Sequence, residues 1–177
     1  MLTKNQPGQY PEYFDRYVSQ LPNNTDVFEI LAAQPQQLSD LLTNMSELNA
    51  EKGYAPGKWS IKEVIGHLID ADRVFAYRCL CISRREGQSL PSFDENTYVE
   101  YGNFNSRSLS NLLEEFSIAR QSHLALFNSL DEEMLNQMGV ASNKPIMAKA
   151  LIVITAGHAL HHLKILEERY LNKLLPA

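Results

Sequence analysis

The chain has 177 residues, of which 44% are hydrophobic, and 16 Lys and Arg against 21 Asp and Glu give it a net charge of −5. This length predicts a single domain over residues 1–177, with its core at about 25–171. The acidic balance and the lack of a basic stripe argue against nucleic acid as a partner. The longest apolar run, at 150–156, is far shorter than the roughly 20 residues of a membrane span. The start lacks the apolar core of a signal peptide, so we expect a soluble cytoplasmic protein with no membrane partner.

The first part of the chain combines aromatic residues and prolines. This pattern predicts a loop and a short helix at about 11–20 that packs across the domain through its aromatic side chains. Asp26 can cap a helix that begins at Val27. Pro35 has no amide donor and clashes with the preceding turn, so this segment is either one kinked helix or two shorter helices. Residues 48–58 contain two glycines and a proline, which predicts a loop.

The clearest helix start in the sequence is at Ser60. The stretch from Ser60 to Glu63 matches a capping box, in which each of these two side chains accepts a hydrogen bond from the other residue's backbone amide. We therefore assign Glu63 a structural role. A helix can run from here to about Arg84, and a single histidine, His67, falls on its apolar side. After a break rich in turn residues, a short helix is expected at 93–101.

The next helix is predicted to start at Asn105 or Ser106 and to run to about Leu130. Its apolar residues are spaced by threes and fours, which is typical of a helix that faces a core. His123 lies on this apolar stripe. A lone core histidine is more often hydrogen-bonded than metal-binding, and we treat His123 as a candidate pocket wall.

A last long helix is predicted near the C-terminus. After a turn at 131–144, Pro145 suits its first turn, and the helix extends to about Leu171. The β-branched run at 151–155 could also form a buried strand, but periodic sequence continues for about 25 residues and favours the helix. Four long helical segments joined by loops predict an all-α fold, a four-helix bundle with short extra helices.

Three of the five histidines lie within five positions, at His158, His161 and His162. Helical residues four apart share one face, so His158 and His162 can offer two imidazoles to one metal ion. His161 could also turn inward, although the four-residue pair is the more usual arrangement. A solvated histidine pair without a metal is the competing interpretation. His67 is the natural third ligand, because bundle cores bind metals through side chains of facing helices.

Both histidine helices place a glycine directly before a histidine, at Gly66 and Gly157. Glycine inside a helix costs about 1 kcal/mol relative to alanine, which indicates either a close backbone approach or relief of a helix crossing. Three neutral imidazoles suit zinc, nickel, iron or copper. They would leave at least one coordination position open for water or substrate, as in reactive sites.

Three segments resemble the DinB-like superfamily, and in particular its YfiT-type branch: Trp59–Asp70, Phe75–Arg78 and Ala156–Leu163. The resemblance extends over most of the chain, from about Tyr17 to Tyr170. It implies a four-helix bundle with up-down-down-up connectivity. It also implies a divalent metal held by His67, His158 and His162, which leaves His161 as a neighbour of the site.

Members of this family that look similar include thiol-dependent S-transferases that use bacillithiol, mycothiol or glutathione, and others described as metal-dependent hydrolases. The resemblance thus implies a metal-dependent enzyme that transfers a low-molecular-weight thiol to a small electrophile. Zinc or nickel is favoured, with iron or copper as alternatives. The nucleophile would be a metal-bound thiolate or water, and no catalytic side chain is identified.

Two other functions remain open. One is a hydrolase that uses metal-bound hydroxide, and the other is a non-catalytic metal-binding protein of a stress response. In every case the expected partner is a small molecule, and the resemblance is compatible with a homodimer. Asp72 stands where a glutamate is common in the family, and His123 where a threonine is common. The substrate is therefore not carried over from relatives.

Overall fold

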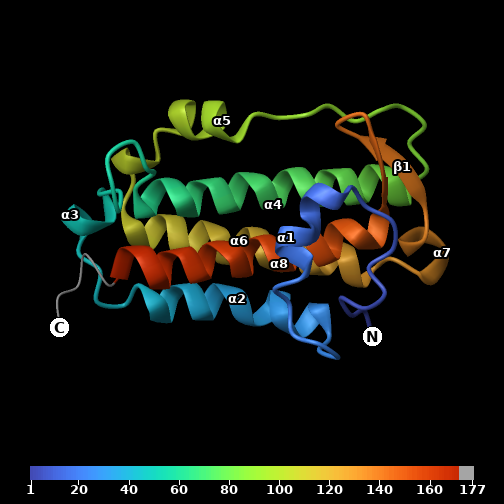
Figure 1. Ribbon diagram of the computed structural model, residues 1–177, viewed down its shortest axis with the longest axis horizontal. Coiled ribbons are helices and arrows are strands. Elements are labelled where there is room, and N and C mark those ends of the chain that lie inside the picture. Colours follow the sequence, from blue (N-terminus) through green and yellow to red (C-terminus); the bar gives the residue numbers. More distant parts are fainter. Residues whose placement is uncertain (172–177) are drawn as a thin grey trace.

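The computed structural model describes residues 1–171, and its long axis follows four helices that lie side by side (Figure 1). α4 packs against α6 and α8, and α2 packs against the same two helices. α2 and α8 run in one direction and α4 and α6 in the other, because the connection between α4 and α6 travels back along the bundle (Figure 1). The predicted up-down-down-up four-helix bundle is confirmed. Its helices are α2 (Val27–Leu41), α4 (Ile61–Ser83), α6 (Leu109–Asn128) and α8 (Ala148–Ile165).

Local capping decides where these helices begin. The capping box is present at α4, where the Ser60 amide donates to Glu63 Oε2 at 2.7 Å and the Glu63 amide donates to Ser60 Oγ at 3.1 Å. α6 begins at Leu109, slightly later than predicted, because Ser108 is its cap and accepts a hydrogen bond from the Asn111 amide. The structural role expected for Glu63 is confirmed.

α2 remains one helix although Pro35 lies inside it. Pro35 has no amide proton to donate to the carbonyl oxygen of Leu31, one turn earlier. Arg120 of α6 supplies the missing donor, because its Nη1 donates to that oxygen at 3.2 Å. Of the two alternatives that the sequence leaves open, the structure has the single helix.

The same arginine is the centre of a buried polar network that joins all four helices. Arg120 and Asp72 are both fully buried, and Nε and Nη2 of Arg120 donate to Asp72 Oδ2 at 2.9 and 2.7 Å. Nη1 also donates to Gln34 Oε1 of α2. Gln34 in turn donates to the carbonyl oxygen of Ala156 of α8 at 2.8 Å. The network therefore fixes α8 two residues before His158.

The segment before α8 differs from the prediction of a turn at 131–144 with Pro145 in the first helical turn. Ser142 and Asn143 have φ of 52° and 60°, the left-handed values that a two-residue hairpin turn requires. Pro145 lies in a two-stranded antiparallel sheet, where both strands are edges and a missing amide donor is tolerated. α8 therefore begins only at Ala148. The short elements here are α7 (Glu132–Leu135), β1 (Met138–Ala141) and β2 (Lys144–Met147).

The remaining short elements lie around the ends and one side of the bundle (Figure 1). The predicted short helices at 11–20 and 93–101 are present with shifted bounds, and the second begins after the Asp94 cap. The predicted loop at 48–58 overlaps one helical turn, which Ser46 caps. These elements are η1 (Glu12–Phe14), α1 (Asp15–Val18), α3 (Glu47–Ala50), α5 (Glu95–Gly102), η2 (Phe104–Ser106) and the π-helical turn η3 (Leu166–Leu171).

The β-branched run at 151–155 is helical and fully buried inside α8, which confirms the helix over the strand. α1 crosses α8 at Gly157, where an added Cβ would lie 2.6 Å from the carbonyl oxygen of Tyr17. At Gly66 an added Cβ would lie 2.3 Å from the Phe104 ring. Both glycines thus permit close approach of another segment. Within residues 1–171, no helix combines the length and apolar character needed to cross a membrane.

Candidate metal centre

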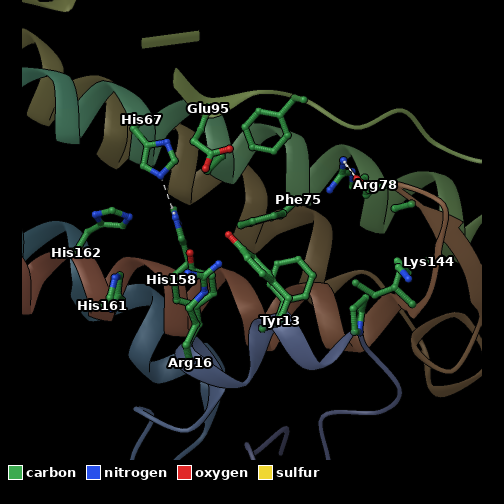
Figure 2. A pocket seen from close by; sticks show the side chains of 18 of the residues that line it. Tyr13, Arg16, His67, Phe75, Arg78, Glu95, Lys144, His158, His161 and His162 are labelled. Atoms are coloured by element: carbon green, nitrogen blue, oxygen red, sulfur yellow. Dashed lines mark hydrogen bonds between the residues drawn. The ribbon is translucent and has the colours of Figure 1, made fainter. Parts of the chain in front are cut away.

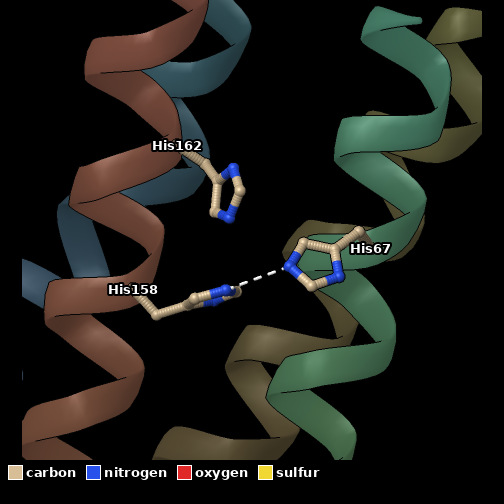
Figure 3. A group of neighbouring side chains, drawn as sticks. All are labelled: His67, His158 and His162. Carbon is tan, nitrogen blue, oxygen red and sulfur yellow. Dashed lines mark hydrogen bonds between the residues drawn. The ribbon is translucent and has the colours of Figure 1, made fainter. Parts of the chain in front are cut away.

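His67 of α4 faces His158 and His162 of α8 across the space between the two helices (Figure 3). Each residue offers one ring nitrogen, and these atoms all lie within 4.8 Å of one another. The Nε2 atoms of His67 and His158 are 3.0 Å apart. The three rings have centroids 4.7 to 4.9 Å apart in pairs. Helix packing thus brings together the three histidines that the sequence singles out.

The three imidazoles are neutral at neutral pH. Burial lowers the pKa of His67 to about 4. Burial, followed by the nearby imidazoles, lowers the pKa of His158 and of His162 well below the usual 6.5. A neutral imidazole keeps a ring nitrogen with a free lone pair, which is the form that binds a metal ion.

The spacing of these nitrogens fits a metal ion. Each Zn–N bond is about 2.0–2.1 Å, so two imidazole nitrogens on a tetrahedral zinc lie about 3.3 Å apart. The observed separations, from 3.0 Å up to at most 4.8 Å, include this value. In the part of the chain that the structure describes, no Asp, Glu or Cys joins the group. Three protein ligands would leave at least one coordination position for a small molecule.

The other two histidines lie outside this group. His161 Nδ1 is 2.9 Å from Gln20 Nε2, which donates to it, and the His161 ring packs against Tyr17 with centroids 5.2 Å apart. It is a neighbour of the three histidines, as expected. His123 lines a separate groove with Arg73 and residues of α6. His123 is thus a wall residue, as expected, but of this groove and not of the pocket that contains the three histidines.

A pocket of about 410 Å³ opens onto the three histidines (Figure 2). Its walls come from the segment around α1, from α4, from the start of α5, from the β1–β2 hairpin and from α8. Phe14 and Phe75 form part of an aromatic wall with ring centroids 6.3 Å apart. Trp59 packs on His67 with a centroid distance of 4.9 Å. The pocket also contains four charged side chains: Arg16, Arg78, Glu95 and Lys144.

The sequence identified none of these four charged residues as part of a site. Only Arg78 could have been suspected from the sequence, because it lies on the same side of the predicted helix as His67. Arg16, Glu95 and Lys144 lie in short or irregular elements whose places depend on tertiary packing. The aromatic segment near residue 14 was expected only to pack across the domain, and it also forms one wall of the pocket.

A family model described as the DinB superfamily matches residues 30–166. The chain belongs to the DinB superfamily. This DinB-superfamily chain is similar to the solved structure of YfiT from Bacillus subtilis, described as a probable metal-dependent hydrolase with an unusual four-helix bundle topology. The TM-score is 0.71, with 17% sequence identity, and the match covers 81% of this chain and 87% of that chain. At this identity the likeness establishes the shared fold. A comparison with curated proteins gives no match.

The buried imidazoles predict that this DinB-superfamily chain, without metal, loses stability as the pH falls from 7 to 5. A histidine in the unfolded chain has a pKa near 6.5 and takes up a proton in this range, whereas folded His67, with a pKa of about 4, does not. Because the unfolded state binds more protons, the free energy of unfolding falls with pH, by about 2 kcal/mol from His67 alone. Urea unfolding of chelator-treated protein at both pH values measures the change.

Two variants separate this effect from the titration of other groups. His67→Leu should show a shallower dependence of unfolding free energy on pH than the parent. His161→Leu should stay closer to the parent, because His161 is only half-buried. Equal pH dependence in the parent and in His67→Leu would contradict the prediction.

Proposed function

We propose that this chain is a metal-dependent enzyme in which His67, His158 and His162 hold a divalent transition metal, with zinc or nickel favoured. The observation that carries the proposal is the convergence of three neutral imidazoles at one end of a pocket of small-molecule size. A structural zinc site is almost always closed by four protein ligands, whereas a three-ligand group beside a pocket is typical of a catalytic site. The description of YfiT as a probable metal-dependent hydrolase supports a metal-dependent activity.

The leading chemistry is the transfer of a low-molecular-weight thiol to a small electrophile. A divalent metal at this position would act as a Lewis acid and lower the pKa of the thiol. The thiol would be a separate small molecule, because neither Cys79 nor Cys81 lines the pocket. Cys79 is buried, its Sγ donates to the carbonyl oxygen of Ala148 at 3.5 Å, and burial raises its pKa to about 12.

Hydrolysis is the second candidate, and Glu95 is the observation that favours it. This carboxylate lines the same pocket as the three histidines, and in Figure 2 it lies on the side of the pocket that carries His67. A carboxylate in such a position can accept a proton from an attacking water. In that reaction the same three histidines would hold the metal, and no thiol would be needed.

Metal analysis followed by paired assays tests the proposal. Protein reconstituted with zinc or nickel is assayed with a chlorodinitrobenzene electrophile and, in turn, bacillithiol, mycothiol or glutathione. A nitrophenyl ester without thiol is assayed in parallel. We expect thiol-dependent product that disappears on chelation while circular dichroism shows an intact fold.

The other outcomes separate the alternatives. Ester hydrolysis without thiol would favour the hydrolase, and it should then depend on Glu95. Unfolding on chelation, with no turnover of either substrate, would support a structural metal in a non-catalytic protein. A protein that binds no stoichiometric metal would contradict the proposal in all its forms.

A further inference from the structure

Arg78 is a buried arginine with no carboxylate partner among residues 1–171. The residue is 5% exposed. Its Nη2 donates to the carbonyl oxygen of Pro91 at 2.6 Å and to Ser142 Oγ at 3.0 Å. Nε and Nη1, which carry three of the five guanidinium protons, donate to none of the residues 1–171. Arg120, the other buried arginine, is paired with Asp72. Nε and Nη1 are not among the fully enclosed polar atoms, and Arg78 lines the pocket, so an anion in the pocket could supply the missing counter-charge.

Arg78 lies on the same side of α4 as His67, about three helical turns further along, which corresponds to about 16 Å of rise. Figure 2 shows Arg78 at the end of the pocket opposite His67 and His162, with Lys144 at the same end. The hydrogen bond from Arg78 to Ser142 attaches the hairpin turn beside Lys144 to α4. The two cations thus lie at one end of the pocket and the three histidines at the other.

The charge of the pocket differs in sign from that of the protein. Three cationic side chains, Arg16, Arg78 and Lys144, line it against one carboxylate, Glu95, whereas the whole chain has a net charge of −5. A pocket lined by an excess of one charge concentrates ligands of the opposite charge. This pocket therefore favours anionic ligands.

Aromatic and aliphatic side chains form much of the pocket wall. Phe75 and Ile146 are buried, and Phe14 and Phe93 are further apolar side chains of the lining. The Arg78 guanidinium carbon lies 5.7 Å from the centroid of the Phe93 ring, so the cation borders this apolar part directly. A ligand that reaches from the histidines to Arg78 has to bury an apolar or aromatic body on the way.

We propose that Arg78, assisted by Lys144, forms an anion-binding subsite that holds the carboxylate, or an equivalent anionic oxygen group, of an organic substrate. The apolar body of this substrate lies against Phe14 and Phe75. Because Nη2 already donates to Pro91 and Ser142, Nε and Nη1 remain as separate, charge-assisted donors to an anionic oxygen group. The assignment of the opposite end as the reacting end rests on the proposed function, whereas anion binding at Arg78 requires no metal.

Calorimetric titration with octanoate and with octanamide tests the subsite. These probes have the same apolar chain, and only octanoate is charged. The full chain is titrated after chelation, so that a carboxylate cannot bind at a metal ion instead. Charge-assisted hydrogen bonds predict that octanoate binds about 10- to 100-fold more tightly than octanamide.

Variants locate the anion within the pocket. Arg78→Gln should lose about 10-fold or more of its octanoate affinity, to the level of octanamide. Lys144→Gln, at an exposed position, should lose only about 2- to 5-fold, and less at high salt. Arg84→Gln is the matched control, because Arg84 is exposed at the end of the same helix and outside the pocket lining. It should bind octanoate like the parent.

Two results would overturn the subsite: equal affinity of the parent for octanoate and octanamide, or unchanged octanoate affinity in folded Arg78→Gln. Thermal unfolding establishes whether that variant is folded. If it is not, the comparison of the two probes on the parent decides. Because these titrations use metal-free protein, a failure of the subsite is distinct from a failure of the proposed metal-dependent activity.

Discussion

Replacing His158 with alanine is expected to remove both the bound metal and the metal-dependent turnover. His158 is 3% exposed, and its Nε2 lies 3.0 Å from the Nε2 of His67, so alanine at this position leaves the group with two imidazoles. Loss of a partner outside the ligand set of a metal site commonly costs about 10- to 100-fold in affinity or activity. Loss of one of three ligands should cost at least about 100-fold. The effect is measured in two ways: by the metal content of the dialysed variant, and by its turnover in the thiol-transfer and ester assays.

The matched control for this variant is His161→Ala. His161 lies on the same helix, but its Nδ1 is hydrogen-bonded to Gln20 and it is outside the three-histidine group. The His161 variant should keep stoichiometric metal. Unchanged metal content in His158→Ala would contradict the assignment of the ligands, as would equal loss of metal in both variants.

Replacing Arg120 with methionine is expected to lower the free energy of unfolding by about 3–5 kcal/mol. The substitution would leave the Asp72 carboxylate buried without a counter-charge, and breaking a buried ion pair on one side typically costs this much. It would also remove the donor to the Leu31 carbonyl oxygen, which Pro35 leaves without a helical partner. Urea unfolding followed by circular dichroism measures the change.

A double variant and a surface control test the reason for this loss. The double variant Asp72→Leu with Arg120→Met removes both charges and should be more stable than Arg120→Met alone. Arg73→Met breaks an ion pair with Glu115 from a side chain that is 51% exposed, and should cost at most about 1 kcal/mol. A loss below about 1 kcal/mol in Arg120→Met would show that the network contributes little. Additive losses in the double variant would show that the two residues act independently.

The Arg120 network also reaches the helix that carries His158 and His162. Gln34, which accepts a hydrogen bond from Arg120, donates to the carbonyl oxygen of Ala156, two residues before His158. The Arg120 variant should therefore bind metal more weakly even where it remains folded. Metal titration of the folded variant, at low temperature and neutral pH, measures this effect.

Features that depend on a few neighbouring residues could be predicted from the sequence alone. The start of α4 follows from Ser60 and Glu63, whose side chains satisfy amides within one helical turn. The long helices follow from apolar spacing, and the pairing of His158 with His162 follows from helical geometry. Helical geometry alone did not identify His67 as the third ligand. That prediction also used its place on an apolar stripe and the family resemblance.

Features that depend on contacts between distant residues were decided only by the tertiary structure. Pro145 suits a helix start by its own geometry, and the left-handed turn at Ser142 and Asn143 together with strand pairing places it in β2 instead. Whether a buried arginine is paired is also a tertiary property. Arg120 has Asp72 as a partner, whereas Arg78 lines the pocket and forms no ion pair with any of the residues that the structure describes. Local hydrogen bonds and periodicity are encoded over one or two helical turns, but the shape and charge of a pocket arise where separate segments meet.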